Sequence, residues 1–183
     1  ETVLNKLEES GSKIVKKGNS ILIHSKSIKA VDIKTAPFPG FPTDLQAPFM
    51  ALMTIAKGRS TISERIFENR MNHVELLNQM GASIKVKNNI AHINGVKKLK
   101  GMDLIGTDLR SSAALIIAAL TSEETSHIYG LEHLDRGYEK IESKLSKLGV
   151  KIKRERANDV SNNSKDQVKG YSKENSKITI KAA

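Results

Sequence analysis

Apolar and polar positions along this chain form a pattern that repeats about every seventy residues. In each copy, leucines at helical spacing lead into a glycine, and a short stretch of alternating apolar and polar residues follows. The copies span residues 7–14, 77–84 and 145–152. A glycine after a helical pattern is typical of a helix end, and a period of two is typical of a strand. Each copy therefore predicts a helix that ends at a glycine and continues into a strand.

Turn residues follow the first two of these strands. Gly18-Asn19 stands before a second apolar stretch, 21–23, and Asn88-Asn89 stands before another, 90–93. Short turns of Gly and Asn between two such stretches are typical of β-hairpins. We therefore predict a hairpin in each of the first two copies.

The regions ahead of the second and third copies also repeat. Thr43-Asp44-Leu45 matches Thr107-Asp108-Leu109, and each string opens an apolar helical pattern for which Thr-Asp is a suitable N-cap. The predicted helices cover 46–56, 72–80, 110–120 and 138–148, with short strands at 60–63 and 125–129. One unit thus reads strand, helix, strand, helix, strand, strand. This βαβαββ repeat predicts a mixed α/β (α+β) fold.

The repeat also predicts how the chain is organised. Residues 29–96 and 97–155 form two copies of the unit, whereas 1–28 begins in the second helix and lacks the front half. An incomplete copy leaves an apolar helix face and a strand edge without partners. We therefore expect a fragment of a longer protein, or a chain that needs another segment.

Residues 156–183 form a polar tail after the last copy. Its Ser/Asn/Lys-rich part, 158–175, replaces the hairpin turn and is expected to be flexible. The apolar and Thr residues within 177–181 favour a returning strand after this long loop, with a disordered tail as the alternative.

The composition limits the possible functions. The chain has 183 residues, of which 38% are hydrophobic and 27% charged, as in soluble globular proteins. It has no Cys, which excludes disulfides and a cysteine nucleophile within it and fits a cytoplasmic setting. It has no apolar run of roughly 18 residues, so no membrane span is expected. The net charge of +10 either attracts phosphates and polyanions or reflects a lysine-rich solubilising surface.

Three residues at junctions between predicted elements point to a site for an anionic substrate. Asp44 follows the proline-rich run 35–43, Arg110 closes the string 107–110, and Arg136 follows Asp135 before a predicted helix. Guanidinium groups bind carboxylates and phosphates through two parallel hydrogen bonds, and a carboxylate can accept a proton. We expect the prolines to stiffen the loop that places Asp44, with Gly40 at positive φ.

Structural roles for the same residues are the alternative. Asp44 and Asp108 would then serve only as helix caps, and the arginines only as surface ion pairs, which contribute about 0–1 kcal/mol each. The candidate partners are Asp135 for Arg136 and Glu68 for Arg70. His73 and His133 have no metal-ligand pattern around them, so we interpret both as structural and predict no metal site.

Four strings resemble the signature of the UDP-N-acetylglucosamine 1-carboxyvinyltransferase family. They are TAPFPGFPTDLQA at 35–47, IFENR at 66–70 with His73, TDLR at 107–110 and HLDRGY at 133–138. The similarity runs in order along most of the chain. It implies two similar domains, each built from three units around a pseudo-threefold axis as an inside-out α/β barrel. This chain would be most of one domain, from the C-terminal part of the enzyme.

The resemblance also implies a reaction. The family transfers the enolpyruvyl group of phosphoenolpyruvate to the 3-hydroxyl of UDP-N-acetylglucosamine, the first committed step of bacterial peptidoglycan synthesis. The roles it implies are base and sugar contact for Asp44, backbone contact with the sugar nucleotide for Ile66, phosphoenolpyruvate binding for Arg110 and Arg136, and support for Arg70 and Asp108. No cofactor, metal, membrane or nucleic acid is implied.

The same resemblance places the general-acid cysteine and the phosphoenolpyruvate-binding lysine in an N-terminal half that this chain lacks. The chain alone is therefore expected to be inactive. Two other functions remain open from the sequence, namely a basic module that binds nucleic acid and a non-catalytic paralogue that keeps the fold.

Overall fold

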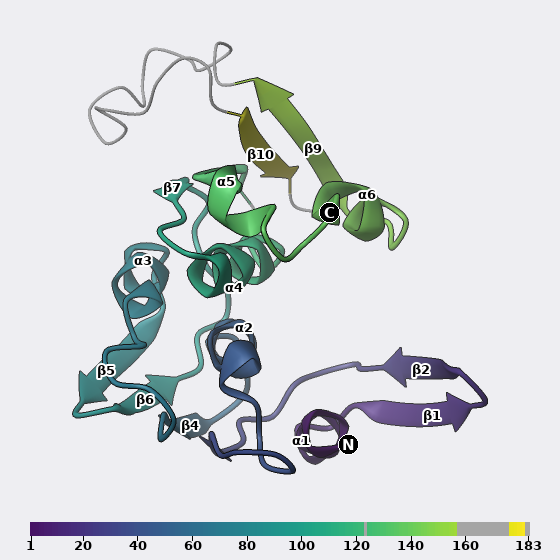
Figure 1. The fold of residues 1–183 in the computed structure, drawn as a ribbon, viewed down its shortest axis with the longest axis vertical. Coiled ribbons are helices and arrows are strands. Elements are labelled where there is room, and N and C mark those ends of the chain that lie inside the picture. The colour runs from purple at the N-terminus through teal and green to yellow at the C-terminus, as the bar shows by residue number, and fades with distance from the viewer. Residues whose placement is uncertain (123, 157–175, 182–183) are drawn as a thin grey trace. The chain divides into compact units, whose positions relative to one another are not determined.

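The structure, a computed structural model, describes residues 1–122, 124–156 and 176–181. The chain divides into two compact units, Glu1–Lys97 and Lys98–Ala183. In Figure 1 the first unit runs from purple to teal and the second from teal through green to yellow. The stretch 158–175, for which flexibility was predicted, lies outside the described residues.

The first unit contains a hairpin with its helix and one complete copy of the repeat. Its elements are α1 (Thr2–Glu9), β1 (Lys13–Lys17), β2 (Ser20–His24), β3 (Ile33–Lys34), the 3-10 helix η1 (Thr43–Leu45), α2 (Gln46–Met53), β4 (Arg59–Ser63), α3 (His73–Gln79), β5 (Ser83–Lys87) and β6 (Ile90–Asn94). Strands β1 and β2 form a two-stranded sheet, and the other four form a sheet in the order β3-β4-β6-β5. Only β3 and β4 are parallel, because α2 connects them.

The second unit repeats this topology. Its elements are β7 (Asp103–Ile105), α4 (Leu109–Ala119), β8 (Ser126–Tyr129), α5 (Leu131–Leu134), α6 (Ile141–Ser146), β9 (Lys151–Arg156) and β10 (Ser176–Lys181). The sheet order is β7-β8-β10-β9, with β7 and β8 parallel and the other pairs antiparallel. The predicted βαβαββ repeat and the α/β class are confirmed. The returning strand that the sequence favoured is β10.

The three repeated glycines end their helices as predicted. Gly11, Gly81 and Gly149 have φ values of +100°, +92° and +90°. In the first copy the amide of Ser12 donates to the carbonyl of Leu7 at 3.0 Å, and the other two copies contain the same bond. This hydrogen bond closes the last helical turn and turns the chain into the strand.

Several details differ from the prediction. Helix α6 begins at Ile141 rather than 138, because Lys140 has a left-handed φ of 46° that a helix cannot continue through. A short helix, α5, was not predicted. Gly40 does not have a positive φ, so that expectation was wrong. Glycine is required there because a Cβ would lie 2.5 Å from the Cβ of Ala36.

Each unit has its own apolar core between its sheet and helices. The buried residues of the first include Ile33, Ile62 and Ile93 from the sheet and Met50, Met53 and Leu77 from the helices; those of the second include Leu104, Ile128 and Ile178 from the sheet and Leu115 and Ile116 from α4. The Ala- and Met-rich helices α2 and α4 are therefore core helices, as predicted. None of the helices in the described part of the chain has the length and apolarity to span a bilayer.

Candidate active site

The proline-rich loop between β3 and η1 is held by its own backbone. The amide of Ala36 donates to the carbonyl of Phe41 at 3.1 Å, and the amide of Gly40 donates to Pro37 at 2.7 Å. The Phe41 ring is buried and meets the Phe49 ring of α2 edge-on, with centroids 5.4 Å apart. These contacts fix the loop against the core, so the residue that follows it has a defined position.

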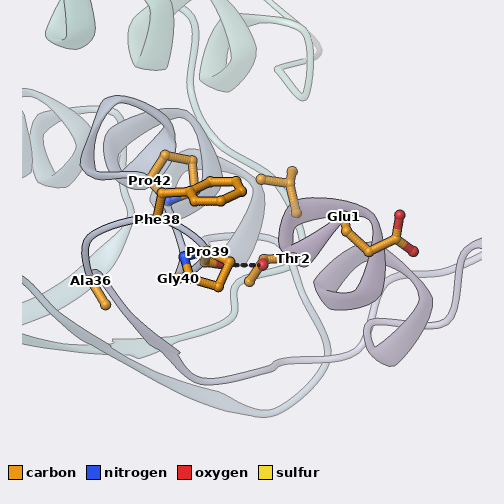
Figure 2. Close-up of a pocket in the computed structure, with 8 residues that line it drawn as sticks. Glu1, Thr2, Ala36, Phe38, Pro39, Gly40 and Pro42 are labelled. Carbon is orange, nitrogen blue, oxygen red and sulfur yellow. Dashed lines mark hydrogen bonds between the residues drawn. The ribbon is translucent and has the colours of Figure 1, made fainter.

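A small pocket lies between this loop and the first turn of α1. Figure 2 shows its lining residues and the hydrogen bond of 2.6 Å in which the Thr2 hydroxyl donates to the carbonyl of Pro39. Phe38 at its edge is almost fully exposed. Asp44 and Arg70 do not line this pocket, so it is distinct from the predicted site.

Asp44 lies inside η1 and not at the N-cap of α2, which is Leu45. Asp44 is therefore not the residue that caps α2. Its side chain is 68% exposed and lies 3.5 Å from Nη1 of Arg70, whose side chain is 19% exposed. Arg70 thus pairs with Asp44 and not with Glu68, the partner considered from the sequence.

Arg70 is held by two further contacts. Its Nη1 donates to the hydroxyl of Thr43 at 2.8 Å, and its Cζ lies 3.9 Å from the centroid of the Phe67 ring. A guanidinium held by a hydroxyl, a ring face and a carboxylate loses little further freedom on binding a ligand. The structure therefore brings Asp44 and Arg70 together, a pairing that the sequence did not indicate.

Glu64 lies beneath this pair, and the sequence did not indicate it. Its side chain accepts hydrogen bonds from the hydroxyls of Thr35 and Thr43, both at 2.8 Å, and from the amides of Ile66 at 2.8 Å and Phe67 at 3.2 Å. Burial by itself raises the pKa of this carboxyl, but the four donors together hold the pKa below its ordinary value. Glu64 is therefore a buried carboxylate that connects the proline-rich loop to the segment after β4.

Ile66, the predicted backbone contact, lies half-buried in that same segment. Because its amide is bonded to Glu64, the backbone here is fixed relative to Thr43 and Asp44. Three of the six predicted site residues thus belong to one cluster in the first unit, comprising Asp44, Ile66 and Arg70.

The second unit holds the other three. Asp108 is the N-cap of α4, and its carboxylate accepts from the amides of Arg110 at 2.8 Å and Ser111 at 3.0 Å. The Ser111 hydroxyl accepts a hydrogen bond from the amide of Asp108 at 3.1 Å, which completes a capping box. The cap predicted for Asp108 is confirmed, and it fixes Arg110 in the first turn of α4.

Arg136 is exposed in the turn after α5. A Cβ on the neighbouring Gly137 would lie 3.0 Å from a methyl carbon of Leu109, so this turn packs against the first residue of α4. The alternative in which Asp135 neutralises Arg136 is wrong, because Asp135 forms two hydrogen bonds with Arg154 of β9, at 2.7 and 3.0 Å. Arg154 also bonds to Glu142 of α6 at 3.2 Å and so fixes the turn that carries Arg136.

Comparison with known proteins assigns the fold and the family. The sequence model of EPSP synthase (3-phosphoshikimate 1-carboxyvinyltransferase) matches residues 1–145 of the chain. The chain belongs to the EPSP synthase family. This confirms the resemblance to enolpyruvyl transferases that the sequence strings indicated.

Two curated relatives match most of the chain. UDP-N-acetylglucosamine 1-carboxyvinyltransferase of Prochlorococcus marinus is 74% identical over 91% of the chain, and that of a Synechococcus species is 51% identical over 83%. The chain spans only 36% and 35% of the length of these two relatives.

Solved structures agree with the assignment. The enolpyruvyl transferase NikO from Streptomyces tendae superposes with a TM-score of 0.72 at 28% identity, over 81% of this chain and 35% of that protein. EPSP synthase from Acinetobacter baumannii superposes with a TM-score of 0.66 at 16% identity, over all of this chain and 38% of that protein, and shows the shared fold.

Proposed function

We propose that this chain is part of an enzyme that transfers the enolpyruvyl group of phosphoenolpyruvate to the 3-hydroxyl of UDP-N-acetylglucosamine, with release of phosphate. The observation that carries the proposal is the 74% identity, over 91% of the chain, to an enzyme named for this reaction. This reaction is the first committed step of peptidoglycan synthesis, and we place it in the cytoplasm. The nucleic-acid-binding alternative is not favoured, because relatives at 51–74% identity carry the enzyme's name.

The first unit supplies the proton acceptor in this proposal. The acceptor hydroxyl must lose a proton as its oxygen bonds to the enolpyruvyl carbon, and an accessible carboxylate can take that proton. Asp44 is accessible, rigidly placed by η1 and oriented by Arg70. Ile66 would contact the sugar nucleotide through the backbone segment that Glu64 fixes.

The second unit supplies the phosphoenolpyruvate clamp. The substrate carries a carboxylate and a phosphate, and both suit the forked donors of Arg110 and Arg136. Asp108 holds Arg110 at the start of α4, and the Gly137 turn brings Arg136 to the same end of that helix. Asp108 therefore supports the clamp from the cap position.

We further propose that the rest of the enzyme completes the incomplete copy at the start of the chain. In the complete copies, β6 and β10 each pair with strands on both edges, whereas within the described residues β2 pairs only with β1. Its residues Ile21, Leu22 and Ile23 are exposed. An antiparallel strand equivalent to β4 or β8 would cover this edge.

Exchange of a matching segment tests the proposed function. This chain would replace the corresponding part of the Prochlorococcus marinus enzyme, and phosphate release would be measured with phosphoenolpyruvate and either UDP-N-acetylglucosamine or 3-phosphoshikimate. We expect this chimera to react with the sugar nucleotide, and the chain alone to show no turnover. A folded chimera that is inactive, or that uses only 3-phosphoshikimate, would contradict the proposal. Turnover by the chain alone would contradict the need for a further segment.

Replacing Arg136 with Lys in this chimera tests the clamp. The variant keeps the charge but loses one of two parallel charge-assisted hydrogen bonds, worth about 1.5–3 kcal/mol. We expect kcat/KM for phosphoenolpyruvate to fall roughly tenfold to a hundredfold in steady-state kinetics. Arg59→Lys, a matched change at an exposed position of β4, should leave it unchanged. Equal kinetics in the two variants would remove Arg136 from the clamp.

A further inference from the structure

Glu64 accepts several hydrogen bonds near the proposed base, but the proposed reaction gives it no contact with a substrate. Glu64 is only 2% exposed, directly after β4, and accepts four hydrogen bonds. Two come from hydroxyls at the ends of the proline-rich loop, and two come from backbone amides after β4. A buried carboxylate is costly unless it is fully bonded, so these four donors also fix one another's positions.

Glu64, Thr43 and Arg70 form a chain of hydrogen bonds, called the hydroxyl relay below, and the bond from Thr43 to Glu64 fixes which group donates at each step. The Thr43 hydroxyl has one proton, which it donates to Oε2 of Glu64, so its oxygen is left to accept from Nη1 of Arg70. A carboxylate at the start of this relay allows only this polarity, because it cannot donate. The negative charge of Glu64 also polarises the hydroxyl, which strengthens the bond that Arg70 makes to it.

The second support of Arg70 begins at the same carboxylate. The amide of Phe67 donates to Oε1 of Glu64, and the Phe67 ring lies under the guanidinium of Arg70. Arg70 in turn lies 3.5 Å from Oδ1 of Asp44. Both contacts that hold Arg70 beside Asp44 therefore depend on Glu64.

We propose that Glu64 is a positioning residue, which sets the place of Arg70 and through it the orientation of the Asp44 carboxylate toward the acceptor hydroxyl. The inference rests on the proposed function, because it takes Asp44 as the base. It assigns to Glu64 an effect on the acceptor and not on phosphoenolpyruvate, whose proposed clamp lies in the second unit.

Glu64→Gln in the chimera tests this role. The substitution keeps the shape but can place an amide donor against Thr43, which removes the acceptor of the hydroxyl proton and competes with Arg70 for the hydroxyl oxygen. We expect kcat to fall about tenfold to a hundredfold, as for small misplacements of a reacting group. The KM for UDP-N-acetylglucosamine should rise severalfold and the KM for phosphoenolpyruvate should stay unchanged. A merely structural role would lower the folded fraction and the apparent kcat without moving either KM, and that result would overturn the proposal.

Two variants of Thr43 provide the matched control. Thr43→Ser keeps the hydroxyl and should retain the parent kinetics. Thr43→Val removes the hydroxyl and should, like Glu64→Gln, raise the KM for UDP-N-acetylglucosamine while the KM for phosphoenolpyruvate stays unchanged. If serine is as damaging as valine, the hydroxyl relay is not the cause and the proposal fails.

Crystal structures of the chimera and its Glu64→Gln variant separate this inference from the proposed function. We expect Arg70 Nη1 to leave Thr43 and the Asp44 carboxylate to change orientation in the variant. An inactive parent would contradict the function while these structures still decide the positioning role. An unmoved Arg70 and Asp44 would overturn the role even if the parent is active.

Discussion

Replacing Asp44 with Asn in the chimera is expected to lower kcat by about 10²- to 10⁴-fold, the usual loss when a general base is removed. The side chain keeps its size and one oxygen that accepts hydrogen bonds, but it can no longer take the proton of the acceptor hydroxyl. Arg70 should stay in place, because Thr43 and the Phe67 ring hold it independently of Asp44. The rate of the chemical step, measured as single-turnover phosphate release, should therefore fall by the same factor as kcat.

Glu68→Gln is the matched control for this prediction. Glu68 is an exposed carboxylate in the same segment as Arg70, and the same isosteric change there should leave kcat within about twofold of the parent. Because Asp44 is 68% exposed, neither variant should change the melting temperature measurably. If Asp44→Asn keeps full single-turnover rates, Asp44 is not the base.

The two Thr-Asp strings show how far sequence alone leads. They are nearly identical and both precede an apolar helical pattern, so the repeat alone predicts the same N-cap role for Asp44 and Asp108. The structure separates them, because Asp108 is the N-cap of α4 while a turn of 3-10 helix places Asp44 one residue before the N-cap of α2. Local pattern thus located the junction, but the conformation of a few intervening residues decided which carboxylate caps a helix and which faces solvent.

The contacts of Glu64 and Arg154 could not be predicted from the sequence. Glu64 bonds to a hydroxyl 29 residues away, and Arg154 bonds to Asp135, 19 residues away. Glu64 has no periodic signal, because its counterpart directly after β8 is Gly130. Repeats and glycine caps are local features that the pattern records. These two anchoring contacts arise only when strands from different parts of the chain pair.

Gly95→Ala is expected to lower the stability of the first unit strongly. A Cβ at this position would overlap the carbonyl oxygen of Ala56 and lie 2.8 Å from its carbonyl carbon. These are backbone atoms, so the connection between α2 and β4 must move. Hydrogen bonds from Gly95 to Gly58 and from Val96 to Thr54 would be strained with it. We expect a loss of roughly 3 kcal/mol in the free energy of unfolding.

Gly18→Ala separates this overlap from the general cost of replacing a glycine. No atom lies within 4 Å of a Cβ on Gly18, but its φ of +55° is unfavourable for alanine, so a loss of about 1 kcal/mol is expected. Urea unfolding followed by circular dichroism should give Gly95→Ala a clearly lower free energy of unfolding than Gly18→Ala. Amide hydrogen exchange should locate the loss in β4 and β6, because the displaced carbonyl lies between α2 and β4, and β6 runs directly into Gly95. Equal losses of unfolding free energy in the two variants would mean that the connection between α2 and β4 moves at little cost. The close approach at Gly95 would then not stabilise the fold.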